Sequence, residues 1–276
     1  MYQSTAFLWG ILPLSSAAFA YFLTAFILEF FFIQTKNAVT APGKSLLPRR
    51  RKGLREGGRV AAIQSNRSAI SFYQQVTTAS WILLGPPGWI NACLSAVLLP
   101  WLIPPSHDGV YPQLPFSKCM IHLIMLQIIG DFFLYWGHRV QHWSPFLWKH
   151  FHSKHHRIDT PTPVSTLYID PIDATLQGGI PFVLASAVVR PHPYTFAVYV
   201  FLRIAENVIN HSGIDSCMLS MITLKFPCLG RCPIAYHDKH HLLYNHGPNA
   251  KNFAEIFWIW DWMFGTLSHY RYEDTK

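Results

Sequence analysis

Charged residues are scarce in this chain of 276 residues. Asp, Glu, Lys and Arg together make up 13% of it, which is roughly half of what soluble domains usually carry. Only 14 residues are acidic, and half of all residues are hydrophobic. The mean hydropathy is positive, at +0.18. This composition excludes an ordinary soluble protein and indicates an integral membrane protein.

Cysteine pairs and strand signals are missing as well. The five cysteines form no CxxC pair, which argues against a disulfide framework. The apolar runs are too long and continuous for the strands of a membrane barrel. Because a chain exposed to lipid must form helices or a closed barrel, we predict an all-α protein.

Long apolar runs supply the predicted helices, since a span takes about 20 residues. A run of Gly85, Pro86, Pro87 and Gly88 interrupts one of them. We expect a multi-pass membrane helical bundle with about four spans. The apolar regions cover residues 7–33, 79–103, 119–137 and, as two stretches that form two passes or a re-entrant pair, 164–209.

Positive charge is concentrated in one segment. Nine of the 22 Lys and Arg lie between Lys36 and Arg67, where Glu56 is the only acid. A basic run can bind nucleic acid, but between two apolar segments it favours a cytosolic loop set by the positive-inside rule. We therefore expect no nucleic-acid partner. Counting passes from this loop places residues 138–156 and 211–241 on the same cytosolic face.

Histidines dominate those two segments. Of 15 histidines, nine form an HxxxH pair, two HxxHH boxes and one single position. Positions i, i+3 and i+4 share one face of a helix, so each box is predicted to present its imidazoles together. The nine are His138, His142, His152, His155, His156, His211, His237, His240 and His241.

This set of histidines predicts a dinuclear metal site. Nine imidazoles exceed what one ion can bind, whereas two adjacent ions could use them. Imidazole suits iron, zinc and copper, so the ligand type alone does not select the metal. Closed zinc sites usually include cysteine, and soluble di-iron bundles use Glu and ExxH motifs; the boxes contain neither.

The surrounding residues resemble those of the sterol desaturase and fatty acid hydroxylase superfamily. The similarity covers roughly residues 119–267, and the HSG element is similar to that of C-4 sterol methyl oxidases. After the last box, His246 replaces the tyrosine of the family's Asn-Tyr-Gly, and we interpret it as a loop residue rather than a ligand. The similar segments are Asp131–Arg139 (DFFLYWGHR), Trp148–His156 (WKHFHSKHH), His211–Gly213 (HSG) and Trp260–Thr266 (WDWMFGT).

The resemblance implies both architecture and chemistry. It implies two iron ions held by the nine histidines, in a cytosolic dome on the endoplasmic reticulum membrane. Such enzymes use O2 and electrons that cytochrome b5 and its NAD(P)H reductase usually deliver. They hydroxylate, oxidise or desaturate a sterol, fatty acyl chain, terpenoid or other lipid-like substrate. Residues 1–118 would then form an N-terminal membrane anchor region and residues 119–276 the catalytic domain.

Polar residues within or beside apolar stretches are a second set of candidates, because such residues are costly there and usually functional. They include Asp170, Asp173 and Arg203. Two interpretations stay open: a side chain orients an imidazole N–H, or it forms an interhelical ion pair, such as Asp173 or Glu206 with Arg203. Asp131 favours the first, since it lies seven residues before His138 on one helical face. The candidates for supporting the imidazoles are Asp131, Asp238, Glu206 and Asn210.

Two further expectations complete the prediction. No catalytic residue beyond the metal ligands is identified. Apolar residues at helical spacing from Phe253 to Phe264 predict an amphipathic helix on the dome or the bilayer surface.

Two other functions stay open. One is a membrane haem-binding electron carrier, in which HxxHH would place too many imidazoles on one face. The other is a histidine-lined metal transporter, whose ligands should lie inside the spans.

Overall fold

The computed structural model describes residues 4–34, 70–158, 161–214, 217–243 and 249–268. Within these ranges the chain is helical and forms no β-strand, apart from an isolated bridge between Arg231 and Phe257. The basic segment and His246 lie outside the described residues. The all-α prediction is confirmed for the described part of the chain.

Four helical segments are long and apolar enough to cross a membrane, as predicted. They are Phe7–Phe31, Phe72–Leu102, Phe116–Trp143 and Pro171–Val189. The helices within them are α1 (Leu12–Ile27), α5 (Phe72–Leu84), α6 (Pro86–Leu102), α7 (Phe116–Trp143), α9 (Pro171–Ala174) and α10 (Ile180–Val189), with π-helical turns at Phe7–Ile11, Leu28–Gln34 and Thr175–Gly179.

The predicted interruption of the second span is a kink between α5 and α6. Gly85 has an extended conformation between the two helices, and Pro86 begins α6. At this position the missing N–H of proline costs the helix no hydrogen bond. A Cβ on Gly88 would lie 2.1 Å from the carbonyl oxygen of Leu83. The glycine therefore permits the close approach at the bend.

The spans leave most of their apolar surface outside the protein. Only 28–33% of each apolar window is buried inside the structure. Large side chains such as Phe19, Val97 and Ile124 are 61%, 70% and 57% exposed. Such extensive apolar exposure is not found on soluble monomers, so these faces are the ones that lipid would cover.

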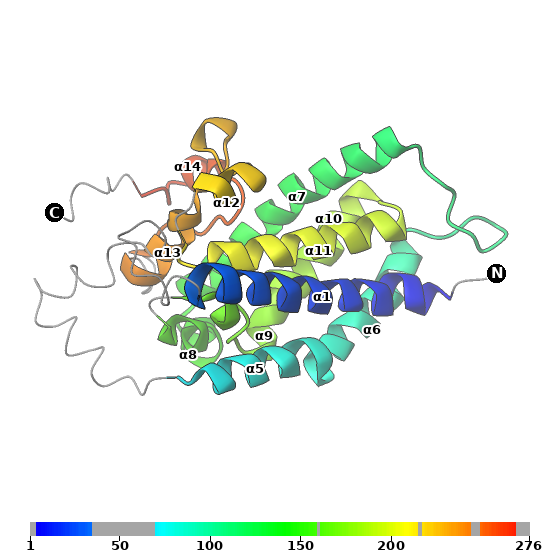
Figure 1. The fold of residues 1–276 in the computed structure, drawn as a ribbon. Helices are drawn as coiled ribbons and strands as arrows, with labels where there is room; N and C mark the ends of the chain where they lie inside the picture. Colours follow the sequence, from blue (N-terminus) through cyan, green and yellow to red (C-terminus); the bar gives the residue numbers. More distant parts are fainter. Residues whose placement is uncertain (1–3, 35–69, 159–160, 215–216, 244–248, 269–276) are drawn as a thin grey trace, which may run out of the picture.

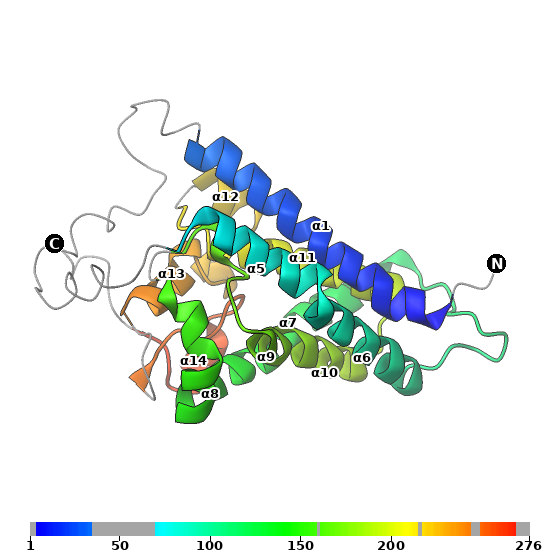
Figure 2. The ribbon, with the colours of Figure 1, turned by 90° about the horizontal axis from the view of Figure 1, so that it is seen from below.

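Helix α11 (Pro193–Asn210) joins the spans into one bundle (Figure 1). It packs along α1, while α7 packs against both α10 and α11. Buried Tyr21 of α1 donates a hydrogen bond of 2.7 Å from its hydroxyl to the carbonyl oxygen of Val164. The same view, turned by 90°, shows α5 and α6 beside α1 (Figure 2).

The short helices gather at one end of the bundle, which we call the histidine end (Figures 1 and 2). Helix α1 ends and α5 begins on this side. The 28 residues of α7 rise about 42 Å, which is longer than the hydrocarbon core of about 30 Å, and its last turns carry His138 and His142 among the short elements. The short elements are α8 (Pro145–His150), α12 (Cys217–Ile222), α13 (Ile234–Leu243), α14 (Ile259–Met263) and 3-10 turns at His152–Arg157, Pro163–Ser165 and Pro227–Leu229.

The amphipathic helix predicted from Phe253 to Phe264 is wrong, because only Ile259–Met263 is helical. The two carboxylate oxygens of buried Asp261 accept the backbone N–H groups of Phe253 and Ala254 at 2.9 and 2.8 Å. Asp131 of α7 accepts those of Ile256 and Phe257 at 3.0 and 2.9 Å. Carboxylates thus satisfy these four N–H groups. Residues 253–257 therefore need no helical hydrogen bonds between backbone groups.

Replacing Gly137 by alanine is expected to lower the free energy of unfolding by about 1–3 kcal/mol, as overpacking does. A Cβ at Gly137 would lie 2.4 Å from the carbonyl oxygen of Leu176, a backbone atom that can move only with its chain segment. Thermal unfolding of the purified protein measures the loss. Gly178→Ala is the matched control, because a Cβ there meets nothing within 4 Å; equal destabilisation by both changes would contradict the packing argument.

Candidate metal centre

All nine histidines of the predicted set are buried at the histidine end. The structure separates them into two groups in which the candidate ligand nitrogens lie within 4.8 Å of one another. The five-histidine set is His138, His142, His152, His156 and His240, and the four-histidine set is His155, His211, His237 and His241.

Each HxxHH box contributes to both sets. The i, i+4 pair His152 and His156 belongs to the five-histidine set, whereas His155 belongs to the other. In the second box the arrangement is reversed, since His237 and His241 join the four-histidine set and His240 the five-histidine set. The expectation that a box presents its imidazoles together therefore holds only for its i, i+4 pair. The first of these boxes is also a 3-10 turn rather than an α-helix.

The spacing of the ring nitrogens fits bound metal ions. In the five-histidine set, Nε2 of His152 lies 3.0 Å from Nε2 of both His142 and His156. In the four-histidine set, Nε2 of His237 lies 3.0 Å from His211 and 3.1 Å from His241. Ligands at right angles around an ion with bonds of about 2.1 Å are about 3.0 Å apart.

Four imidazoles are oriented by hydrogen bonds from Nδ1. His138, His211 and His240 donate to the carbonyl oxygens of Phe253, Asn207 and Lys251 at 3.0, 2.8 and 2.7 Å, and His152 donates to Asp173 at 3.0 Å. With the proton on Nδ1, the lone pair of Nε2 is free to face the other nitrogens of the same set.

Converging lone pairs repel one another unless a cation lies between them. Nε2 of His138 is buried and has no hydrogen-bond partner among the described residues. Burial lowers the pKa of His237, His240 and His241 well below the usual value, and the neighbouring imidazoles lower it further. These three rings are therefore neutral at pH 7, which is the form that binds a metal. The donor set thus fits two metal ions.

Asp173 is the carboxylate that supports an imidazole. It is fully buried, accepts from Nδ1 of His152 and also accepts from Nε2 of Gln177 at 2.6 Å. The sequence indicated Asp173 only as one of several costly polar residues and gave no reason to prefer it. Its partner lies 21 residues earlier in the chain, so no helical spacing connects the two.

The four residues predicted to support the imidazoles have other described contacts. Asp131 holds the backbone at Ile256 and Phe257, and Asn210 donates to the carbonyl oxygen of Glu255 at 3.1 Å. Glu206 pairs with Lys225 and Arg231, not with Arg203. Asp238 lies on α13, but its side chain falls outside the described part of the structure.

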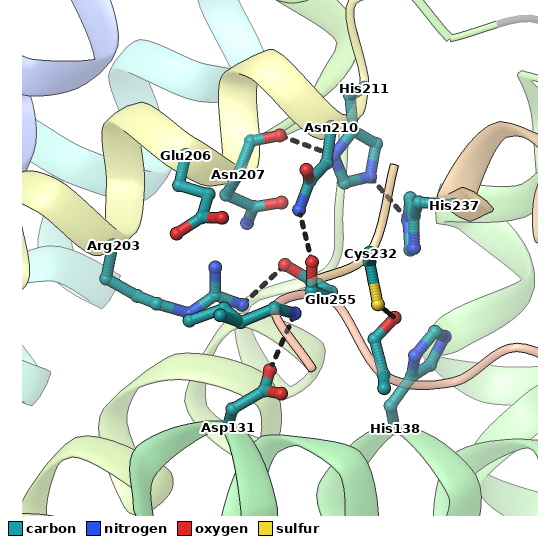
Figure 3. A network of polar contacts seen from close by, with 12 residues as sticks. Asp131, His138, Arg203, Glu206, Asn207, Asn210, His211, Cys232, His237 and Glu255 are labelled. Carbon is teal, nitrogen blue, oxygen red and sulfur yellow. Dashed lines mark hydrogen bonds and ion pairs between the residues drawn. The ribbon is translucent and has the colours of Figure 1, made fainter. Parts of the chain in front are cut away.

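Two acidic residues that the sequence did not single out organise this region. Glu255 accepts a hydrogen bond from Arg203 of α11 (Figure 3). Burial alone would raise the pKa of Glu255, but the charge of Arg203 lowers it below the usual value, so the pair is ionised. Asp261 stands inside the WDWMFGT segment, which is the signal that could have identified it.

The part of the chain that holds all nine histidines matches known proteins. A family model described as fatty acid hydroxylase matches residues 123–266. The very-long-chain aldehyde decarbonylase GL1-11 of Oryza sativa subsp. indica is 34% identical over 145 residues, which are 52% of this chain and 51% of the relative. Methylsterol monooxygenase 2-2 of Arabidopsis thaliana is 32% identical over 162 residues, 58% of either chain.

The similarity is partial in extent. Methylsterol monooxygenase 2-1 of Arabidopsis thaliana is 33% identical over 175 residues, covering 59% of this chain and 62% of the relative. The chain spans about half the length of the curated relatives it matches. No solved structure gives a significant match.

Proposed function

This chain belongs to the fatty acid hydroxylase family, and we propose that it is a membrane-bound, non-haem di-iron oxygenase. It would hydroxylate, oxidise or desaturate an apolar substrate with O2. The observation that carries the proposal is the division of nine buried histidines into two adjacent sets, one for each ion. Bound iron would supply the activation of O2 for attack on an unactivated C–H bond.

An apolar cavity supports a lipid-like substrate. It has a volume of about 150 Å³ and lies among the four spans and α11. Its wall includes Gln177, whose side chain contacts His152, and Asn207, whose carbonyl holds His211. A substrate in this cavity would therefore lie next to residues that contact one histidine of each set. A sterol, a terpenoid or a fatty acyl chain has the required apolar character.

The protein's own part in the reaction follows from these contacts. The spans and α11 would bind the substrate and exclude water from its apolar body, and the ring of oriented imidazoles would fix both ions. Asp173 and the carbonyl groups of Phe253, Asn207 and Lys251 would hold the imidazole protons away from the ions.

The electron supply and the cellular location are part of the proposal. Reducing equivalents would come from cytochrome b5 and its NAD(P)H reductase, or from a similar donor. The histidine end would face the cytosol from the endoplasmic reticulum membrane. Residues 1–118 would serve as the anchor region and residues 119–276 as the catalytic domain.

Metal analysis combined with product analysis tests this function. The purified protein is expected to contain two irons per chain and no haem absorption band. After expression in a host that lacks the activity, it should yield an oxygenated or desaturated lipid in the presence of O2. A haem spectrum would favour the electron carrier, and metal uptake into vesicles without substrate oxidation would favour the transporter.

A further inference from the structure

Arg203 is a buried cation with unused hydrogen-bond donors. Arg203 is only 1% exposed, and one terminal nitrogen of its guanidinium donates to Glu255. Its Nε and other terminal nitrogen are buried and have no hydrogen-bond partner among the described residues. Arg203 also lines the apolar cavity. Because an unpaired buried donor is costly, this arrangement indicates that a ligand supplies the acceptor.

Asn207 lies one helical turn further along α11 and also lines the cavity. Its side-chain oxygen is buried and has no hydrogen-bond partner within the described ranges. Residues i and i+4 are neighbours on a helix surface, and Figure 3 shows both side chains extending from α11 to the same side. The cavity therefore offers donors and an acceptor at one position.

The combination selects the chemical class of the ligand. A hydroxyl group can accept from a guanidinium and donate to an amide oxygen at once, whereas a ketone can only accept. A carboxylate is disfavoured because Glu255 already compensates the charge of Arg203, and a second buried anion would have no cation of its own. A hydrocarbon would leave every one of these groups unpaired.

We propose that Arg203 and Asn207 form a hydroxyl-binding site at the histidine end of the cavity. The proposal rests on the proposed function and narrows its substrate to an apolar alcohol. Asn207 lies one helical turn and Arg203 two turns before His211 on the same helix, so the site lies on the side of the cavity that leads to the four-histidine set.

Equilibrium binding of three rigid probes to the full chain in nanodiscs tests this site. The probes are decahydro-2-naphthol, 2-decalone and decahydronaphthalene, and empty nanodiscs correct for partition into lipid. The wild-type protein should prefer the alcohol over the hydrocarbon by roughly tenfold or more, and over the ketone by roughly threefold to tenfold. Equal binding of all three probes would overturn the proposal and mean that water satisfies the polar groups.

The variant Asn207→Leu removes the acceptor but keeps the backbone carbonyl that holds His211. It should bind the alcohol and the ketone equally, because only the donors of Arg203 remain. Asn91→Leu is the control, since Asn91 lines the same cavity and also has an unpartnered oxygen in the described structure. An alcohol preference lost in Asn91→Leu and kept in Asn207→Leu would place the hydroxyl elsewhere.

Iron content and O2 consumption, measured on the same samples, separate this proposal from the proposed function. Two irons and O2 consumption without any alcohol preference would overturn the hydroxyl site alone. An alcohol preference in a protein that contains no iron would support the hydroxyl site and contradict the di-iron oxygenase.

Discussion

Replacing His237 and His241 together by alanine is expected to leave about one iron per chain and to abolish turnover. Both belong to the four-histidine set, and their loss leaves only His155 and His211 there. The five-histidine set contains neither residue, so its ion should stay. Changes at residues that only support ligands cost 10–100-fold, and loss of the ligands themselves should exceed roughly 100-fold. Elemental analysis and product formation measure the two effects.

A variant with His142, His152 and His156 all replaced by alanine provides the mirror experiment, because it also leaves only two histidines, His138 and His240, in its set. It should empty the five-histidine set and leave the iron of the four-histidine set. His150→Ala is the matched control, because this histidine stands in the same segment but is exposed and belongs to neither set. If both of these multiple variants lost all iron, or if either kept two irons, the two sets could not be separate ion sites.

Replacing Asp173 by asparagine is expected to weaken iron binding or turnover by 10–100-fold, the usual effect of removing a partner of a metal-bound histidine. The two carboxylate oxygens accept from His152 and from Gln177. An amide has only one oxygen, so its NH2 group would face one of these donors. Iron titration against a chelator, together with turnover, measures the loss.

Asp170→Asn is the control for this change. It removes the same charge three residues earlier, where the Asp170 side chain caps α9 by accepting from the N–H of Ile172 at 2.9 Å. Asparagine caps helices about as well as aspartate, so iron binding should be unchanged. Equal losses from both variants would indicate a general effect of charge rather than the contact with His152.

The metal site was predictable as a set of residues but not as a geometry. The HxxxH and HxxHH spacings identify eight of the nine histidines that the structure brings together, because a box keeps its members close whatever the fold; the ninth, His211, stands alone in the HSG element. The division of a box between the two sets could not be predicted from these spacings. It depends on how His155 and His156, which are adjacent, point away from one another in a 3-10 turn, and helical periodicity contains no information on that.

The polar support of the site depends on contacts that are distant in sequence. Asp131 and His138 share a helical face, which favoured Asp131 as the supporting carboxylate. Its hydrogen bonds instead join it to residues 125 and 126 positions later. The same contacts account for the wrong helix from Phe253 to Phe264. Local patterns predicted the spans well, because lipid imposes length and apolarity on each span separately.

The sharing of boxes has a consequence for the distance between the two histidine sets. His155 and His156 serve different sets, as do His240 and His241, and consecutive Cα atoms are separated by a fixed distance of about 3.8 Å. Two peptide links therefore connect the five-histidine set directly to the four-histidine set. When the surrounding helices adjust to admit a bulky molecule, the two sets should move as one unit, so the spacing of any ions bound in them would stay constant while the cavity changes shape.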